Sequence, residues 1–447
     1  MDTTAISERL REDGARIRDE LERLVRIPSI SAEGFDAEAV RRSAEETAEI
    51  LTSSGMDVRL AEVDGAHPAV MGGIGGPEGA PTILLYAHHD VQPTGPVELW
   101  SSPPFEPAER DGRLYGRGSA DDKAGVVAHA AAIRAWEGHP PVGVKVFIEG
   151  EEETGSEHLL EFLRRFEDEL RADAIVLADS SNWRIGQPAL TTSLRGLVDC
   201  VVEVRTLDHA VHSGMYGGPV ADALTSLARL LATLHDQRGR VAVPGLRSED
   251  ADPLDLTEEE FRRYAGVRRG VQLIGDGSLT GRLWTQPALS VLGIDAPSVR
   301  DSSNQLVPSA RARVSLRLAP GEDPKAAMDA LVEHLEANAP WGAEVAVTRG
   351  AAATPYRVDA SGPMYEAIRT SFAEAWGRPP VDIGSGGSIP FVSAFAEAYP
   401  DAAIMLTGVE DPEGNAHSEN ESVVLSELER ACLAEALFLG HAVDAAR

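Results

Sequence analysis

Apolar residues follow two alternating patterns along the first third of the chain, one helical and one extended. Residues 6–27 and 36–54 carry them at helical spacing, which predicts two helices. Runs of consecutive apolar residues predict three buried strands, at 82–87, 142–148 and 174–178. Helical stretches at 124–136 and 157–170 separate these runs, and Ser156 is the expected N-cap of the second. Strands that alternate with helices predict right-handed crossovers and a largely parallel sheet, hence an α/β fold.

A different pattern begins at about residue 192. Apolar and polar residues alternate strictly at 198–204, which predicts a strand with one buried face. A helix is expected at 220–235, with Pro219 as its first residue, followed by a long insertion at 240–286. The remaining elements expected in this region are a strand at 288–294, a strand at 310–318, a helix from Asp323-Pro324 to 338 and a strand at 344–348. The order βαββαβ is the ferredoxin-like plan, so we expect a separate inserted domain.

The α/β pattern resumes after about residue 353. A helix is expected at 363–376, and a final helix at Ser426, where Glu429 completes a capping box. The predicted organisation is a discontinuous catalytic domain with an inserted dimerisation or lid domain, divided as 1–191, 192–352 and 353–447.

Composition narrows the class of protein. The 41 Lys and Arg residues against 72 Asp and Glu residues give a net charge of −31, which argues against a nucleic-acid partner. The chain contains no apolar run long enough to cross a membrane, and its N-terminus does not resemble a signal peptide. Cys200 and Cys432 are too few for a disulfide framework and suggest a reducing compartment. We therefore expect a cytoplasmic protein.

Acidic residues and histidines gather in five short segments where strands are expected to end. These segments are AHHD (87–90), GRGSADDKAG (116–125), EGEEETGS (149–156), LADSSN (177–182) and NAHSENE (415–421). The first four follow one another at about the spacing of a βαβ unit. Ligands of open α/β sheets bind beyond the carboxyl ends of the strands, so one shared crevice is expected.

Each segment also has a simpler explanation. His beside Asp is commonly a hydrogen-bonded surface pair, acids before a helix commonly complement its dipole, and three consecutive glutamates are commonly solvated. The conjunction of the five segments carries the prediction of a metal site. Imidazole nitrogens mixed with carboxylate oxygens suit zinc. Two histidines and three carboxylates suffice for two zinc ions, whose charge of +4 is balanced by three carboxylates and one hydroxide.

The motifs YAHHDVQP, LYGRGSADDKAG, EGEEETGS and AHSENE resemble those of the dinuclear zinc peptidases, which include carnosinase-type dipeptidases, glutamate carboxypeptidase and aminoacylases. The resemblance covers most of the chain. The EG-x-EE-x-GS form and the insertion at 240–286 are most similar to the carnosinase-like dipeptidase branch. The resemblance implies that His88 and Asp179 bind one zinc, Glu153 and His417 bind the other, and Asp121 bridges them.

The resemblance also implies the catalytic groups. Glu152 would be the general base that takes a proton from the water bridging the two zinc ions, and the resulting hydroxide would attack an amide carbonyl. Asp90 lies two residues after His88, so on a strand both point to one face and Asp90 would orient the site. Glu151 has no role in this scheme and is expected to be solvated.

The inserted domain supplies the expected substrate contacts. By the resemblance, His212 would reach the active site of a partner subunit and stabilise the oxyanion, and Arg317 would hold the substrate carboxylate. The simpler alternatives are a loop histidine near a helix start and one of three arginines on a solvent-facing side of a strand. Further substrate contacts are expected from Asn304, Gly386, Gly387 and Ser388. A homodimer formed through the inserted domain is the expected assembly.

Two positions depart from the family pattern, and the first of them concerns recognition of the substrate carboxylate. Gly384 stands where members of the branch often carry an arginine, and DDKAG replaces the commoner DDKG-G or DDKG-P. The leading prediction is a zinc peptidase that cleaves dipeptides or short peptides, with manganese or cobalt as alternative metals. An N-acyl-amino-acid amidohydrolase of the same family is the alternative. A non-catalytic metal-binding scaffold is a weaker one, because all six ligand and base positions carry competent residues.

Overall fold

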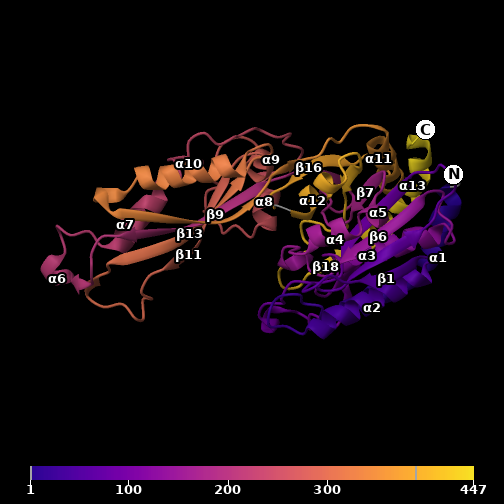
Figure 1. Ribbon diagram of the computed structural model, residues 1–447, viewed down its shortest axis with the longest axis horizontal. Helices are drawn as coiled ribbons and strands as arrows, with labels where there is room; N and C mark the ends of the chain where they lie inside the picture. Colours follow the sequence, from indigo (N-terminus) through magenta and orange to yellow (C-terminus); the bar gives the residue numbers. More distant parts are fainter. Residues whose placement is uncertain (1–2, 388–389, 447) are drawn as a thin grey trace. The chain divides into compact units, whose positions relative to one another are not determined.

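The computed structural model describes residues 3–387 and 390–446 and divides into two compact units (Figure 1). The first unit comprises Met1–Thr192, Val358–Ile383 and Pro390–Arg447, and the second comprises Ser193–Arg357 and Gly384–Ile389. The chain therefore leaves the first unit and returns to it, and the short segment that begins at Gly384 belongs to the second unit.

Four parallel neighbours form the centre of the main sheet in the first unit. Their spatial order is β6 (Gly143–Glu149), β3 (Thr82–His88), β7 (Ala174–Leu177) and β17 (Ala403–Leu406). Each is almost fully buried, as expected for strands covered on both faces. The predicted α/β class and parallel centre are confirmed, although β17 was not predicted.

Antiparallel strands extend this sheet on both sides. β1 (Asp57–Ala61) and β2 (Ala69–Ile74) add to the β6 edge, and β8 (Ala189–Leu194) adds to β17. β8 also pairs with β16 (Val381–Ser385), and its last residues pair with β15 (Tyr356–Arg357). A separate three-stranded sheet contains β4 (Ala108–Arg110), β5 (Arg113–Tyr115) and β18 (Ser422–Val424).

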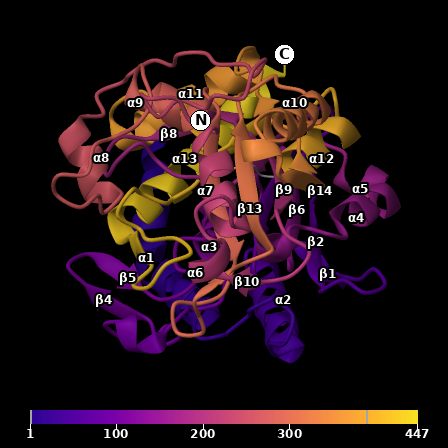
Figure 2. The ribbon, with the colours of Figure 1, turned by 90° about the vertical axis from the view of Figure 1, so that its left-hand side faces the viewer.

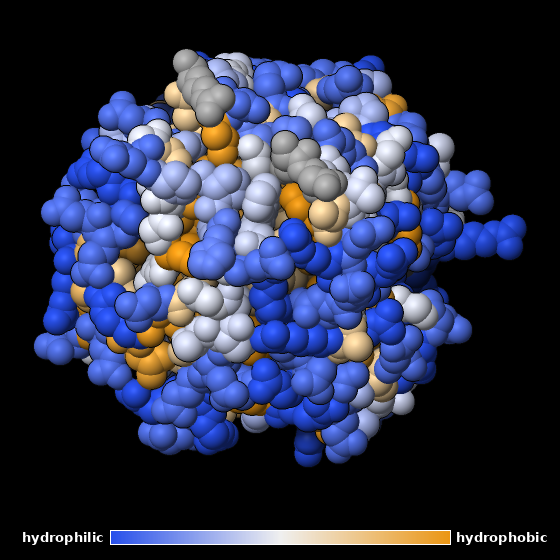
Figure 3. All heavy atoms as spheres, turned by 90° about the vertical axis from the view of Figure 1, so that its right-hand side faces the viewer, coloured by the Kyte–Doolittle hydropathy of each residue, from blue (hydrophilic) through white to orange (hydrophobic). Residues whose placement is uncertain are grey.

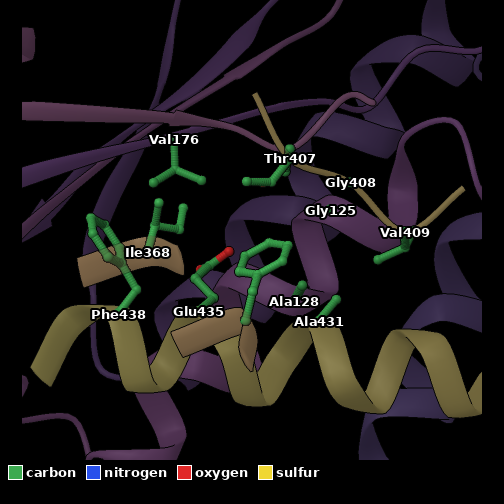
Figure 4. Close-up of a pocket in the computed structure, with 12 residues that line it drawn as sticks. Gly125, Ala128, Val176, Ile368, Thr407, Gly408, Val409, Ala431, Glu435 and Phe438 are labelled. Atoms are coloured by element: carbon green, nitrogen blue, oxygen red, sulfur yellow. The ribbon is translucent and has the colours of Figure 1, made fainter. Parts of the chain in front are cut away.

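Helices cover both faces of the main sheet. On one face, Tyr86 of β3 stacks on Phe391, with ring centroids 4.5 Å apart. On the other face, Val176 of β7 points toward Ile368 and Phe438 (Figure 4). The helices of the first unit are α1 (Thr3–Val25), α2 (Ala37–Ser53), α3 (Lys123–Ala135), α4 (Leu159–Arg165), α5 (Glu167–Leu170), α11 (Pro363–Trp376), α12 (Pro390–Ala398) and α13 (Leu425–Ala445). This three-layer packing explains why the central strands read as continuous apolar runs.

Three predicted helix details are wrong. The single helix expected at 157–170 is two helices, separated at Phe166, and the first begins after His158 rather than Ser156. The last helix begins at Leu425, directly after a strand, with Val424 at its N-cap and no side-chain cap. The expected capping box is therefore absent, because β18 continues to the residue before the helix.

The second unit has the predicted βαββαβ order. Its elements are β9 (Gly196–Arg205), α7 (Ala223–Ala232), β11 (Ala288–Asp295), β13 (Ser309–Leu318), α10 (Pro324–Ala337) and β14 (Glu344–Ala353). The antiparallel sheet has the order β11-β13-β9-β14, and α7 and α10 bury its apolar face in one core. α7 lies beside β13 in two views (Figures 1 and 2). The ferredoxin-like prediction is confirmed.

Helix starts in this unit were predicted with mixed success. Asp323 caps α10, with Pro324 as its first residue, as expected. α7 instead begins after Asp222, whose carboxylate accepts a hydrogen bond from Thr225 N, so Pro219 is outside the helix. The smaller elements of the unit are β10 (Val211–His212), α6 (Ser213–Tyr216), α8 (Glu258–Tyr264), α9 (Leu279–Trp284) and β12 (Gln305–Leu306).

The face of the molecule shown in Figure 3 is mainly hydrophilic, with small and separate hydrophobic areas. This distribution agrees with the excess of acidic residues in the sequence. Within residues 3–387 and 390–446, no helix combines the length and apolar character that a bilayer span requires.

Candidate metal centre

The carboxyl ends of the parallel strands bring the predicted ligands together in the first unit. His88 is the last residue of β3, and Asp179 follows two residues after β7. Glu153 lies in the short 3₁₀ helix Glu152–Thr154, which begins three residues after β6. Asp121 precedes α3, and its peptide bond to Asp122 is cis. Adjacent parallel strands end at the same edge of a sheet, so these side chains meet there.

Asp121 lies between the two histidines. Its Oδ1 is 2.9 Å from Nε2 of His88, and its Oδ2 is 2.9 Å from Nε2 of His417. Nε2 of His417 is also 3.1 Å from Oε2 of Glu153. One carboxylate thus faces each imidazole with a different oxygen, which is the arrangement that a bridging ligand requires.

The other acidic residues complete two neighbouring groups of ligand atoms. His88, Glu152 and Asp179 offer atoms within 4.8 Å of one another, and so do His88, Asp121 and Glu153. Glu152 and Glu153 therefore face different parts of the site although they are adjacent in sequence. The five predicted ligands and the predicted base lie together around Asp121.

The electrostatics of the centre favour cations. Hydrogen bonds to Asp121 and Glu153 raise the pKa of His417 to about 11. Burial raises the pKa of Asp179 to about 7, and the charge of Asp121 adds to this effect. Burial also raises the pKa of Glu152, with the charge of Asp179 adding to it. Protons are thus held tightly where carboxylates are crowded and buried, which is the environment that a divalent cation neutralises.

Asp90 is completely buried behind this centre and organises it. Its carboxylate accepts hydrogen bonds from the backbone N–H groups of Glu152, at 3.2 Å, and Glu153, at 3.1 Å. The hydroxyl of Ser31 donates to it at 2.6 Å. Its Oδ1 also lies 3.3 Å from Nδ1 of His88. Asp90 therefore links the loop after β3 to the loop after β6.

The expectation that Glu151 is solvated is wrong. Its side chain is buried, and its carboxylate accepts hydrogen bonds from His158 N, at 2.7 Å, and His67 N, at 3.4 Å. The ring Nδ1 of His158 lies 3.0 Å from the same carboxylate. Glu151 therefore fixes the glutamate loop to its surroundings, and the run of acids is not a solvated surface feature.

Two residues near the centre were missed by the sequence analysis. Gln92 holds Glu153 through its backbone N, at 3.1 Å, and its Nε2, at 2.8 Å. Glu410 follows β17 and offers a carboxylate oxygen within 4.8 Å of ligand atoms of Asp121 and Asp179. Glu410 was missed because β17, the strand that places it, was not predicted. The polar segment DVQP directly after His88-His89 was the available signal for Gln92.

The other predicted site residues belong to the second unit. His212 pairs with Gln305 across β10 and β12, and Ser213 N donates to the carbonyl of Asn304 at 3.0 Å. Nδ1 of His212 accepts a hydrogen bond from Gly214 N, at 3.0 Å, and the exposed ring caps α6. His212 and Asn304 are thus neighbours, and Nε2 is the ring atom that remains for another contact.

Arg317 differs from the other two arginines of its strand. Arg311 and Arg313 are exposed and bind Asp295 and Asp199, whereas Arg317 is partly buried. Burial lowers the pKa of Arg317. A cation placed in partly buried surroundings is suited to a carboxylate ligand.

The loop that contains Gly386 and Gly387 is held within the second unit. Nε of Arg195 donates to the carbonyl of Gly386 at 3.2 Å, and Gly387 N donates to the hydroxyl of Ser385 at 3.1 Å. Ser388 lies outside the described residues. A Cβ atom at Gly384 would lie 2.6 Å from Cβ of Trp284. An arginine at position 384 therefore has no room in this chain, because Trp284 fills the space.

A cavity of about 20 Å³ lies between the main sheet and helices α3, α11 and α13 (Figure 4). Its lining is mostly apolar, and its one charged side chain, Glu435, lies 2.8 Å from Nδ1 of His129. None of the predicted ligands lines it. The cavity has room for little more than a water molecule, so the chemistry is assigned to the ligand cluster at the strand ends.

The donor set at the strand ends fits a pair of metal ions. Two imidazoles and three carboxylates are the ligand types of zinc and similar divalent ions, and they converge around one carboxylate with both oxygens engaged. The partners of His88, Glu152 and Glu153 behind the site supply the orientation that such ligands need.

Comparisons of the sequence with known proteins identify one peptidase family and dipeptidase relatives. The sequence model of "Peptidase family M20/M25/M40" matches residues 84–440. The chain is 37% identical to a cysteinylglycine-S-conjugate dipeptidase of Corynebacterium striatum over 435 residues, which are 95% of each protein. It is 31% identical to a β-Ala-His dipeptidase of Rattus norvegicus, over 80% of this chain and 76% of the relative.

Solved structures share the fold over nearly the whole chain. Human carnosine dipeptidase 1 superposes with a TM-score of 0.77 at 26% identity, covering 98% of this chain and 99% of that one. The dipeptidase Dug1p of Saccharomyces cerevisiae superposes with a TM-score of 0.81 at 22% identity, covering 99% of each chain.

Proposed function

This chain belongs to peptidase family M20/M25/M40, and from that premise we propose that it is a dinuclear zinc dipeptidase. The observation that carries the proposal is the convergence of two histidines and three carboxylates on Asp121, whose two oxygens each face one imidazole. We assign His88 and Asp179 to one metal, Glu153 and His417 to the other, and Asp121 to both. Zinc suits this mixture of nitrogen and oxygen ligands, with manganese or cobalt as alternatives.

The residues of the chain have distinct tasks in this proposal. When bound, the metal pair would polarise the scissile carbonyl and lower the pKa of a water molecule between the ions. Glu152 accepts the proton of that water and returns it to the leaving amine, which is general acid–base catalysis. Asp90 holds the backbone of Glu152 and the ring of His88, so that base and ligand keep their positions. Burial of Glu152 suits a base that has to hold a proton for part of the cycle.

We place the remaining substrate contacts on the second unit. Arg317 would bind the terminal carboxylate, and Asn304 and the glycines at 386 and 387 would line the backbone of the substrate. His212 would stabilise the oxyanion through Nε2, since its Nδ1 is already engaged by Gly214. Ser388 is included as a substrate contact only because the resemblance to the family implies it.

Glu410 favours dipeptides over N-acyl amino acids. Its carboxylate lies near Asp121 and Asp179, and no described residue donates a hydrogen bond to it. Burial and the charges of Asp121 and Asp179 raise the pKa of Glu410 well above its usual value, so this carboxyl ionises only when a further positive charge lies beside it. A dipeptide brings a free ammonium group that supplies the missing positive charge, whereas an N-acyl amino acid does not. The names of the relatives, which are dipeptidases, favour the same substrate class.

The proposed assembly is a homodimer formed by the second unit. β11 is an edge strand of its sheet, and Val291, Leu292 and Ile294 are 41%, 62% and 52% exposed on it. A long edge strand with exposed apolar residues invites pairing with a second copy.

We also place the protein in the cytoplasm. Cys200 and Cys432 are both free and buried, which fits a reducing compartment.

The test combines metal analysis with a substrate panel. The purified protein should contain about two zinc ions per chain and hydrolyse Cys-Gly and β-Ala-His faster than N-acetyl and N-succinyl amino acids. Glu410→Gln should raise KM for dipeptides, whereas Glu413→Gln, on the exposed part of the same loop, should not. Faster hydrolysis of the acylated substrates would show that the protein is an N-acyl-amino-acid amidohydrolase. A protein that neither binds metal nor is activated by it would end the hydrolase proposal.

A further inference from the structure

Glu421 ends the motif NAHSENE and has no task in the proposed reaction, yet its side chain is completely buried. Its carboxylate accepts four hydrogen bonds from one short segment of chain. Oε1 accepts from the backbone N–H groups of Ala120, at 3.0 Å, and Asp121, at 3.2 Å. Oε2 accepts from Gly118 N, at 3.0 Å, and from Nη1 of Arg117, at 2.7 Å. The carboxylate therefore holds the backbone of the segment that carries Asp121.

Arg117 connects the same hydrogen-bond network to the loop that carries His417. Its Nη2 donates to the carbonyl of Ser418, at 3.1 Å, and to the carbonyl of Pro93, at 3.3 Å. The carbonyl of Glu421 in turn accepts a hydrogen bond from Gly116 N at 3.0 Å. Residues 116–121 and 417–421 are thus joined at both ends by buried hydrogen bonds, and each segment holds one metal ligand.

The loop needs such an anchor because its backbone is strained. His417 has a φ of +62°, and Asn415 and Asn420 also have positive φ values. A histidine in the left-handed region persists only where the surrounding contacts hold it there. The side chain of His417 is 59% exposed, so packing around the ring does not supply that restraint. The hydrogen bonds of Arg117 and Glu421 hold the backbone of the loop, in addition to the contacts of the ring with Asp121 and Glu153.

Glu421 corresponds to Asp90 on the other side of the centre. Asp90 joins His88 to the backbone of Glu152 and Glu153, whereas Glu421 joins the backbone of Asp121 to the loop of His417. Each half of the ligand cluster thus has one buried carboxylate behind it. Residues that orient metal ligands in this way typically change metal affinity by about 10- to 100-fold when replaced.

We infer that Glu421 is a positioning residue that sets the separation of Asp121 and His417 and thereby controls binding of the metal assigned to Glu153 and His417. The inference rests on the proposed dinuclear function. Glutamine at position 421 keeps the size of the side chain but replaces one oxygen by an NH₂ group. In either orientation that group would face N–H donors, those of Gly118 and Arg117 or those of Ala120 and Asp121, so the two segments would separate.

The test titrates zinc into the metal-free full-length chain by calorimetry and counts bound metal after gel filtration. Glu421→Gln should bind the zinc assigned to Glu153 and His417 about 10- to 100-fold more weakly, with a smaller loss at the site of His88 and Asp179, because Asp121 is assigned to both. Arg117→Lys keeps a positive charge beside Glu421 but loses the contacts to two carbonyls, so it should weaken the same site less. Glu413→Gln, on the exposed part of the same loop, is the control.

A second readout separates positioning from general stability. The melting temperature of metal-free Glu421→Gln should fall, because buried Arg117 loses its charged partner, so the readout is the further increase that zinc causes in each protein, which should be smaller in the variant. Two zinc ions bound with wild-type affinities by Glu421→Gln would overturn the inference and leave the dipeptidase proposal intact. If Glu421→Gln does not fold, unchanged zinc affinities in Arg117→Lys would overturn it equally. A wild-type chain that binds no metal pair would overturn the proposed function and this inference together.

Discussion

Nε2 of His88 lies 2.9 Å from Oδ1 of Asp121, close enough for the two atoms to share a proton. The other ring nitrogen, Nδ1, is 3.1 Å from the carbonyl of Asp90 and donates its hydrogen there, so Nε2 is the atom that can bind a metal ion once its own proton leaves. Burial lowers the pKa of His88, but hydrogen bonds to Asp121 and Asp90 outweigh it and raise the pKa well above the usual value. A proton holds the pair together without metal, and a metal ion has to displace it.

Replacing the bridging carboxylate should therefore cost the site its metal pair. Asp121→Asn leaves one acceptor oxygen where two are needed, so bound zinc should fall from about two per chain to at most one, with loss of turnover. Plasma emission spectroscopy on dialysed protein measures this directly. Asp111→Asn is a matched control, because Asp111 is exposed and has a φ of +51°, which asparagine tolerates. Two tightly bound ions in Asp121→Asn would rule out the bridging assignment.

Glu152→Gln should separate chemistry from metal binding. The amide cannot accept the proton of the attacking water, so kcat should fall by about 10²- to 10⁴-fold. Zinc content and KM should change little, because the metal ligands assigned here do not include Glu152. Glu157→Gln, on the exposed part of the same loop, should behave as wild type. A variant that retains full turnover would remove Glu152 from the role of base.

The strands that are buried on both faces could be predicted from the sequence. The run at 82–87 is buried on both faces, and apolar residues at every position mark such a strand without knowledge of the fold. β17 has only four residues and begins five residues after the end of α12, so its apolar run is too short to be recognised as a strand by itself. Its partner β7 is far away in the sequence, so the strand becomes recognisable only when the sheet is assembled.

In the candidate site, too, local sequence patterns predicted some residues, whereas contacts that form only in the folded chain were missed. Five ligand positions could be chosen because acids and histidines gather in short motifs that resemble those of dinuclear zinc peptidases, and the chosen residues meet at Asp121. Glu151 was misjudged because its partners, His67 and His158, approach it only in the folded chain. Hydrogen bonds such as those of Glu421 join segments about 300 residues apart in sequence, for which no spacing rule exists.

Gly384 should tolerate no side chain while Trp284 is present. A Cβ at this position would lie 2.6 Å from Cβ of Trp284, so Gly384→Ala should destabilise the protein by about 1–3 kcal/mol. Gly293→Ala, where a Cβ meets nothing within 4 Å, is the control in the same unit. The double variant with Trp284→Gly, which removes that Cβ, should lose less stability than the sum of the two single variants. Denaturant unfolding measures these differences, and strict additivity would contradict the contact.

Glu149 should make the metal-free protein less stable as the pH rises. Its side chain is buried, Tyr86 donates a hydrogen bond to it at 2.8 Å, and burial raises its pKa from 4.5 to about 8. The folded state therefore binds this proton more tightly than the unfolded state. The free energy of unfolding should fall as the pH rises from about 4.5 to about 8, by up to about 1.4 kcal/mol per pH unit from this group.

Glu149→Gln cannot ionise, so its stability relative to the wild type should increase across the same interval. Urea unfolding in chelator at pH 5, 6, 7 and 8 measures the difference between the two proteins, in which other titrating groups largely cancel. A constant difference between pH 5 and pH 8 would show that Glu149 is ionised throughout.

His212→Ala and Glu152→Ala should complement each other if active sites are shared between subunits. Each homodimer lacks one essential group in both of its sites and should be nearly inactive. In a mixed dimer, one site combines the intact Glu152 of one chain with the intact His212 of the other, while the second site lacks both. Random exchange makes half of the dimers mixed, and each mixed dimer has one complete site, so about a quarter of wild-type activity should return. Differently tagged chains allow mixed dimers to be isolated, and inactivity of those dimers would place His212 in the site of its own chain or in none.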